Sequence, residues 1–173
     1  MLLKHFGFIT RKKDIFMKNF LYLILFSLLI GTNTYAKTPQ EGLAFFNKYT
    51  QYANSYNTEL LNMYSPEVKI IREVVKPTGE TEEVIVPSKR FFKELKLGQK
   101  TAKLRRYKNK YRNVTASQIP NGIKITAERQ PTAETYWLKM YQIIQDTDSG
   151  LKITEEMMQT KVQTRKSPFP TGL

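Results

Sequence analysis

The sequence predicts an α+β protein in which antiparallel strands form a sheet with helices on one of its faces. Three observations support this class. Apolar residues recur at steps of three and four after residue 40, period-two alternation dominates after residue 110, and turn-forming Pro, Asn and Gly separate the segments. The chain has 173 residues, 40% of them apolar and 25% charged, which is usual for one globular domain.

Residues 1–36 have the pattern of a secretory signal peptide. Several Lys and Arg precede an apolar run, FLYLILFSLLI, and small residues at Thr34 and Ala36 mark a cleavage site before Lys37. The run is shorter than the roughly 20 apolar residues that a transmembrane helix needs. We expect cleavage near Ala36 and a periplasmic or secreted protein; an uncleaved inner-membrane anchor is the alternative. Met17 is a second candidate for the translation start.

Export removes the chain's single His, His5, and the chain contains no Cys. The predicted mature protein therefore excludes imidazole and thiolate metal sites, disulfides, Cys nucleophiles and His-dependent triads. We expect neither a metal nor another cofactor.

The first predicted element is a long helix over 39–63. Thr38 and Glu41 form the sequence pattern of a capping box, with Pro at the first helical position. Ser65 and Pro66 should end the helix, because the residue before a proline avoids the helical conformation. One apolar stripe runs along it: Leu43, Phe46, Tyr49, Ala53, Tyr56, Leu60 and Met63.

A hairpin, a second helix and more strands follow. Segments 68–75 and 83–86 predict a hairpin, and a shorter helix after Pro87 is expected to stop or kink near Gly98. Segment 111–119 and its return strand flank a Pro-Asn-Gly turn. Segment 136–145 is apolar on both parities, which favours a strand buried on both faces. The last strand, with Leu151, Ile153, Glu155 and Met157, should run back beside it, within a domain over 37–164 followed by a flexible tail over 165–173.

Two stretches resemble the nuclear transport factor 2-like superfamily, which includes SnoaL-like and ketosteroid-isomerase-like proteins. They are NTELLNMYSPEV at 57–68, and the final hairpin with YWLKMY at 136–141 and DSGLKITEE at 148–156. The resemblance covers about residues 39–162. It implies a curved antiparallel sheet wrapped around a long N-terminal helix and a second, shorter helix, in a cone-like arrangement. Members bind small apolar ligands, catalyse isomerisation, dehydration or epoxide opening, or bind other proteins, so the fold alone does not select a function.

Catalytic residues are not evident. The resemblance implies an Asp or an Asp-His pair in an apolar pocket, but the only Asp residues after residue 36, Asp146 and Asp148, fall in a predicted turn. Glu128 and Glu134 lie at strand ends and could face a cavity, yet no pair of titratable residues has a convincing spacing. We therefore predict no catalytic residue.

Aromatic residues form the candidate ligand-binding set. Four Tyr fall between residues 49 and 64, and each buried hydroxyl needs a hydrogen-bond partner, which favours a polar-lipped cavity for a lipid or another amphipathic molecule. A packed core is the alternative interpretation. The set comprises Tyr49, Tyr52, Tyr56, Phe92, Trp137 and Tyr141.

Basic residues crowd segment 89–112, where Glu94 is the only acidic residue. In an exported protein this composition favours docking on anionic lipid or on an acidic partner, with an ordinary solvated surface as the alternative. Nucleic acid is excluded as a partner by the export route. The candidate residues are Lys100, Lys103, Arg105, Arg106, Lys108, Lys110 and Arg112.

The main hypothesis is a non-catalytic exported binding domain that engages a small apolar or amphipathic ligand, an anionic envelope surface or a partner protein. One alternative is an N-terminally anchored periplasmic subunit of an envelope or secretion assembly, and another is an isomerase or dehydratase. A homodimer is a further candidate state.

Overall fold

The computed structural model describes residues 37–132 and 134–161. The predicted signal peptide at 1–36, its alternative start at Met17 and the tail at 165–173 lie outside the described residues. In chain order the elements are α2 (Pro39–Ser55), the 3₁₀ helix η1 (Thr58–Met63), β1 (Tyr64–Val75), β2 (Thr81–Val86), α3 (Ser88–Leu104), β3 (Asn109–Ile119), β4 (Gly122–Pro131), β5 (Leu138–Thr147) and β6 (Gly150–Lys161).

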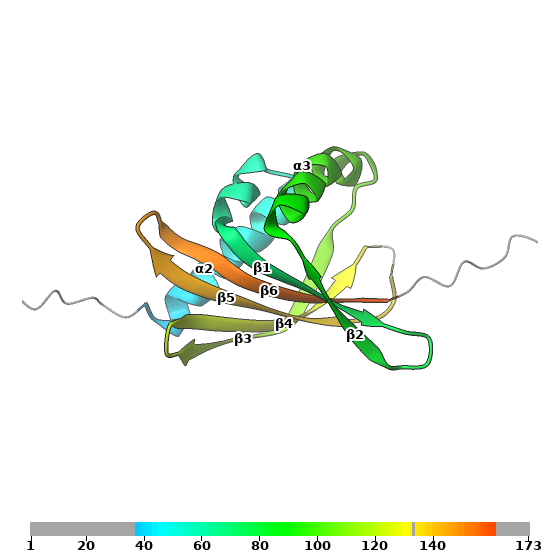
Figure 1. Ribbon diagram of the computed structural model, residues 1–173. Coiled ribbons are helices and arrows are strands. Elements are labelled where there is room, and N and C mark those ends of the chain that lie inside the picture. The colour runs from blue at the N-terminus through cyan, green and yellow to red at the C-terminus, as the bar shows by residue number, and fades with distance from the viewer. Residues whose placement is uncertain (1–36, 133, 162–173) are drawn as a thin grey trace, which may run out of the picture. The chain divides into compact units, whose positions relative to one another are not determined.

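The strands form one sheet in the order β2-β1-β6-β5-β4-β3 (Figure 1). The predicted α+β class is confirmed. The sheet is mixed, because β1 and β6 run parallel while the other four pairings are antiparallel. This parallel contact joins the start of the domain to its end, so no local pattern in the sequence could reveal it.

One face of the sheet, here called the inner face, packs against α2 and carries most of the core. Its buried residues alternate along the strands, as in Ile123, Ile125 and Ala127 of β4. The aromatic rings of Phe46, Tyr49, Tyr64 and Phe91 fill the space between the helices and this face. The opposite, outer face carries mainly half-buried and exposed side chains, and Ile71 of β1 is a buried exception. No helix among the described residues has the length and apolarity to cross a membrane.

Helix α2 begins where the sequence predicts and ends eight residues early, at Ser55. The capping box is formed, with the Thr38 amide donating to the Glu41 carboxylate at 2.7 Å. At the other end Tyr56 adopts a left-handed conformation with φ of 59°, and the Asn57 amide donates to the Tyr52 carbonyl at 3.0 Å. The expected stop at Ser65 and Pro66 is wrong, since both residues belong to β1.

Helix α3 contains 17 residues, as many as α2, and continues through Gly98. The prediction of a shorter helix that stops or kinks at this glycine is therefore wrong. Its end repeats the motif of α2, because Arg106 has φ of 50° and the Tyr107 amide donates to the Ala102 carbonyl at 2.9 Å. A left-handed residue after the last turn commonly ends helices, and it is usually glycine.

The two helical glycines should respond in opposite directions to alanine. Gly98→Ala should stabilise the fold by about 0.5–1 kcal/mol, since a Cβ there meets open space and alanine is the better helix former. Gly42→Ala should destabilise it, because its Cβ would lie 2.6 Å from Cγ2 of the buried Ile123. Urea unfolding of both variants measures the two signs, and a gain for Gly42→Ala would contradict the packing described.

A bulge in β6 decides which residues face inward. Ile153 pairs with Ile144 and Glu155 with Ile143, so Thr154 is an extra residue without a partner in β5. Side chains alternate across a strand, and an extra residue shifts that alternation by one. Glu156 consequently shares the inner face with Ile153, whereas Glu155 lies on the outer face, where it accepts a hydrogen bond from the Tyr141 hydroxyl.

Strand β5 is buried on one face only. Its inner residues Leu138, Met140, Gln142 and Ile144 are buried, whereas the alternate residues are half-buried or exposed. The prediction of a strand buried on both faces is therefore wrong.

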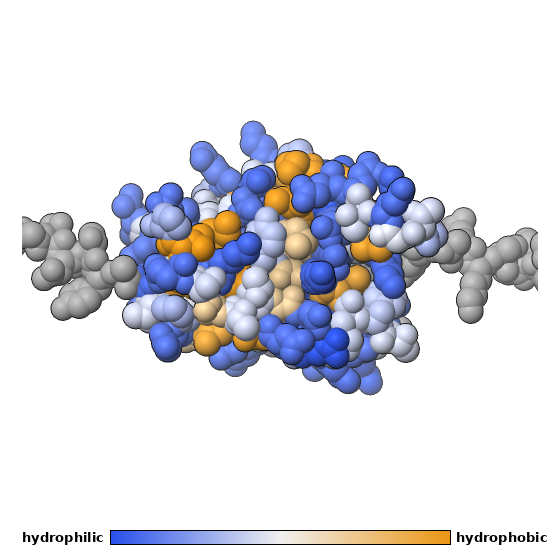
Figure 2. All heavy atoms as spheres, turned by 90° about the horizontal axis from the view of Figure 1, so that it is seen from below, coloured by the Kyte–Doolittle hydropathy of each residue, from blue (hydrophilic) through white to orange (hydrophobic). Residues whose placement is uncertain are grey.

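Seen from the side away from α3, the surface shows apolar patches separated by hydrophilic side chains (Figure 2).

Candidate functional site

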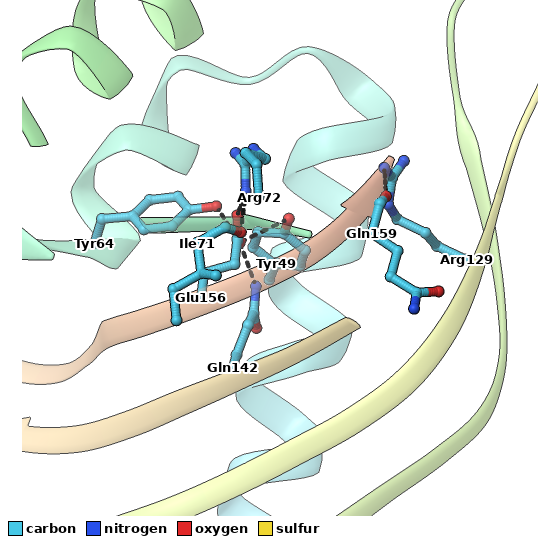
Figure 3. Close-up of polar contacts among 8 residues, drawn as sticks. All are labelled: Tyr49, Tyr64, Ile71, Arg72, Arg129, Gln142, Glu156 and Gln159. Carbon is cyan, nitrogen blue, oxygen red and sulfur yellow. Dashed lines mark hydrogen bonds and ion pairs between the residues drawn. The ribbon is translucent and has the colours of Figure 1, made fainter. Parts of the chain in front are cut away.

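A buried carboxylate lies at the centre of the inner face. Glu156 is 0% exposed, and its Oε2 accepts hydrogen bonds from three side chains (Figure 3). The Tyr64 hydroxyl donates at 2.7 Å, the Gln142 amide at 3.0 Å and the Tyr49 hydroxyl at 3.4 Å. The guanidinium of Arg72 lies 3.4 Å from the other oxygen, Oε1. We call these five residues the Glu156 cluster.

Four elements bring the Glu156 cluster together. Tyr64 and Arg72 come from the two halves of β1, Tyr49 from the middle of α2, and Gln142 from β5, directly opposite Glu156. A buried charge is costly unless it is paired and hydrogen-bonded. Three neutral donors and one cation meet that requirement, so the cluster ties the long helix and three strands to a single point.

Burial changes the titration of the tyrosines in the cluster. Loss of solvent raises the pKa of both Tyr49 and Tyr64 well above its ordinary value, and the negative charge of Glu156 raises each pKa further. Burial also raises the pKa of the neighbouring Tyr111, against the opposing effect of the Arg129 cation. The two cluster tyrosines therefore remain protonated and serve as donors to the carboxylate.

The Glu156 cluster has the chemistry of a structural ion pair. A general base must reach a substrate proton, and it works best when its carboxylate is not already committed to several donors. Glu156 is enclosed, and its two carboxylate oxygens are already engaged by four side chains. Within the described residues, no group of three or more acidic, His or Cys side chains is placed to hold a metal ion.

Arg129 is a second buried polar residue of the inner face, and it is 7% exposed. Its two terminal nitrogens donate to the Asn109 side chain at 3.2 Å and to the Gln159 carbonyl at 3.0 Å. Arg129 thereby links β4 to both β3 and β6 near the end of the sheet that lies away from the Glu156 cluster (Figure 3). Its Nε has no hydrogen-bond partner among the described residues.

The predicted aromatic set does not form one site. Tyr49 belongs to the Glu156 cluster, and Phe92 packs edge-on against Tyr64 with ring centroids 6.4 Å apart. Trp137 and Tyr141 belong to the outer face instead. There the Arg112 guanidinium lies 4.2 Å from the Trp137 ring centroid and Lys124 Nζ lies 4.5 Å from that of Tyr141. Tyr141 alternates with the buried residues of β5, and Trp137 lies just before that strand, so the structure places both rings apart from the Glu156 cluster.

The other two members of that set lie at the surface of α2. Tyr56 is the left-handed residue that ends the helix, and its hydroxyl is buried without a partner among the described residues. Tyr52 lines an open pocket of about 180 Å³. Pockets that enclose drug-sized ligands usually measure roughly 300–1,000 Å³, so this one suits a smaller group. Its lining residues are Phe45, Lys48, Tyr52, Glu59, Asn62, Met63, Leu151 and Lys152.

The predicted basic residues are all exposed, and they fall into two groups. Lys100 and Lys103 lie on the last turns of α3, and Arg105, Arg106 and Lys108 lie in the connection to β3. Lys110 and Arg112 are on the outer face of β3. Arg112 is already engaged there, because its Nε lies 2.6 Å from the Glu128 carboxylate and its guanidinium stacks on Trp137. The seven residues therefore do not form a single surface.

Sequence reasoning missed Glu156, Gln142, Arg72 and Tyr64. Glu155 and Glu156 are adjacent, and an unbroken alternation would have directed Glu155 inward with Ile153. The bulge at Thr154 turns Glu156 inward in place of Glu155, and no glycine or proline lies at the bulge to indicate it. The polar Gln142, which lies between Met140 and Ile144 on the buried side of β5, was the one available signal.

No protein-family model and no curated protein sequence matches the chain. Solved structures do. A candidate dehydratase from the NTF2-like family of Streptomyces avermitilis superposes with a TM-score of 0.55 at 8% identity, covering 72% of this chain and 96% of that one. An NTF2-like protein of unknown function from Pseudomonas putida gives 0.53 at 6% identity, covering 78% and 96%. A DUF3225-family protein of unknown function from Pectobacterium atrosepticum gives 0.53 at 15% identity, covering 70% and 88%. The chain thus has the nuclear transport factor 2-like fold that the sequence predicts.

Proposed function

We propose that this nuclear transport factor 2-like fold serves as a non-catalytic, exported binding domain that recognises an anionic envelope component through its surface. The observation that carries the proposal is a contrast between interior and surface. The carboxylate on the inner face is enclosed and bonded to four donors, whereas the cations of α3 and the following connection are exposed.

The cations define one continuous stretch, here called the α3 basic surface. It comprises Lys89, Lys93, Lys96, Lys100, Lys103, Arg105, Arg106 and Lys108, all exposed. Arg90, which lies among them, is paired with Glu94 at 2.7 Å. Clustered charge of one sign attracts oppositely charged surfaces, and the attraction weakens as salt shortens the Debye length. An exported protein meets such surfaces as anionic headgroups and acidic polymers.

Catalysis is the weaker proposal. The Streptomyces avermitilis structure is described as a dehydratase candidate, but a dehydratase needs an acid or base that faces bound substrate. In this chain the carboxylate on the inner face, Glu156, is enclosed by Tyr49, Tyr64, Gln142 and Arg72. An anchored envelope subunit would bind through the same surface, and the intact mass of the natural protein separates it from a form cleaved before Lys37.

The test compares two charge reversals of equal size on a sulfated polymer column. Lys93→Glu/Lys100→Glu changes the α3 basic surface, while Lys139→Glu/Lys161→Glu changes exposed lysines of the sheet by the same net charge. Each surface cation contributes on the order of 1 kcal/mol to such binding, so the first variant should bind at least about 30-fold more weakly. The control should stay close to wild type. Equal losses in the two variants would mean that net charge alone drives binding, and the proposal would fail.

A further inference from the structure

Helix α3 has an apolar side that the other described residues do not cover. Its packed side carries Phe91, Phe92 and Leu95. On the opposite side Leu97 is 63% exposed and Leu104 is 85% exposed, and two helical turns separate them, so both project in nearly the same direction. Single exposed leucines are ordinary, but two on one line of a charged helix are not explained by packing.

Lysines border these two leucines. At 100° per residue, Lys93 and Lys100 fall within about a sixth of a turn of Leu97, and Lys96 lies further round on the same side. Tyr107, which is 39% exposed, follows the end of the helix among Arg105, Arg106 and Lys108. The uncovered side of α3 is thus an apolar line bordered on one flank by lysines and on the other by the paired Arg90 and Glu94.

This arrangement matches the boundary of an anionic bilayer better than it matches a soluble acidic polymer. Helices that lie in the interface plane combine an apolar side with Lys and Arg that reach back to the headgroups. A polymer of sulfates or phosphates would use the cations and leave both leucines in water. A bilayer uses both parts, because acyl chains take the leucines while headgroups take the lysines.

We propose that α3 lies in the headgroup region of an anionic lipid bilayer, with Leu97 and Leu104 inserted toward the acyl chains. The inference rests on the proposed function and names its partner. It also assigns separate roles along the helix: the lysines provide salt-sensitive attraction, and the leucines provide selection for lipid over other anions.

The first experiment separates charge from insertion. Wild type and Leu97→Gln/Leu104→Gln are floated with phosphatidylglycerol–phosphatidylcholine vesicles and with pure phosphatidylcholine vesicles, and both proteins are run on the sulfated polymer column. Wild type should float with the anionic vesicles alone. The double variant should bind them at least about tenfold more weakly while its retention on the polymer is unchanged. Circular dichroism should show that it is folded, because both side chains are exposed.

The second experiment places a probe beside the leucines. The chain has no Cys, so Thr101→Cys on the exposed side of α3 and Asn121→Cys in the β3–β4 turn each accept one environment-sensitive fluorophore. Anionic vesicles should shift the emission of the probe at residue 101 to the blue and leave the control unchanged.

The outcomes distinguish the two proposals. Retention on the polymer without vesicle flotation would leave an acidic non-lipid macromolecule as partner and overturn the insertion. The insertion would also be overturned if Leu97→Gln/Leu104→Gln bound the vesicles as well as wild type and the emission of the probe at residue 101 did not shift. Failure of wild type to bind either polymer or vesicles would remove the proposed function as well.

Discussion

Replacing Arg72 by Met should lower the free energy of unfolding of the domain by about 3 kcal/mol. Removal of one partner from a buried ion pair typically costs about 3–5 kcal/mol, because the remaining charge is left without a counterion. Glu156 would keep three neutral donors but lose the one cation that pairs with it among the described residues. The expected value lies at the low end of the range, since the Arg72 side chain is 24% exposed and water already screens part of the interaction.

A double-mutant cycle tests the assignment. Glu156→Gln removes the charge, so the Arg72→Met/Glu156→Gln double variant should be more stable than the sum of the two single losses predicts. The guanidinium also lies over the ring of Phe91, with its centre 5.8 Å from the ring centroid, and Met preserves much of that apolar contact. Urea unfolding of the four proteins measures the coupling. Additive losses would show that Arg72 acts through packing and not through its charge.

The start of the fold could be predicted from the sequence, because the signals there are local. The reciprocal pattern of Thr38 and Glu41 fixes the first turn of α2, and the Pro-Asn-Gly turn fixes the β3–β4 hairpin. The helix ends could not be predicted. Both are closed by a left-handed residue with a side chain, Tyr56 and Arg106, where the usual signal is glycine.

The same reasoning explains which parts of the candidate surfaces were found. Clustered lysines are exposed in almost any fold, so the location of Lys100 and Lys103 on the surface followed from their charge. The exposed Leu97 and Leu104 could not be recognised, because the expected end of the helix near Gly98 left them without a common side. Glu156 was hidden for a different reason: one unpaired residue, Thr154, exchanged the two faces of β6.

Alkaline pH should unfold the protein through its buried phenols. Burial raises the pKa of Tyr49, Tyr64 and Tyr111 in the folded state, whereas in the unfolded state each titrates near its ordinary value of about 10. Above that pH the folded state binds more protons than the unfolded state, so the free energy of unfolding falls as pH rises. Each such tyrosine contributes a slope of about 1.4 kcal/mol per pH unit, and three give up to about 4 kcal/mol per unit. Below about pH 10 the contribution is fully present and constant.

The Tyr49→Phe/Tyr64→Phe variant isolates this effect. Near neutral pH it should be less stable than wild type, because Glu156 loses two donors. Above about pH 10 its stability should fall less steeply, since two of the three buried tyrosines with a raised pKa are gone, and the two stability curves should converge. Urea unfolding along the pH axis gives both slopes, and tyrosinate absorbance reports when the phenols ionise. In wild type the absorbance of the buried phenols should appear together with the loss of structure. Ionisation of every tyrosine in a protein that stays folded would mean that Tyr49 and Tyr64 are open to solvent, which contradicts the enclosed carboxylate at the centre of the sheet.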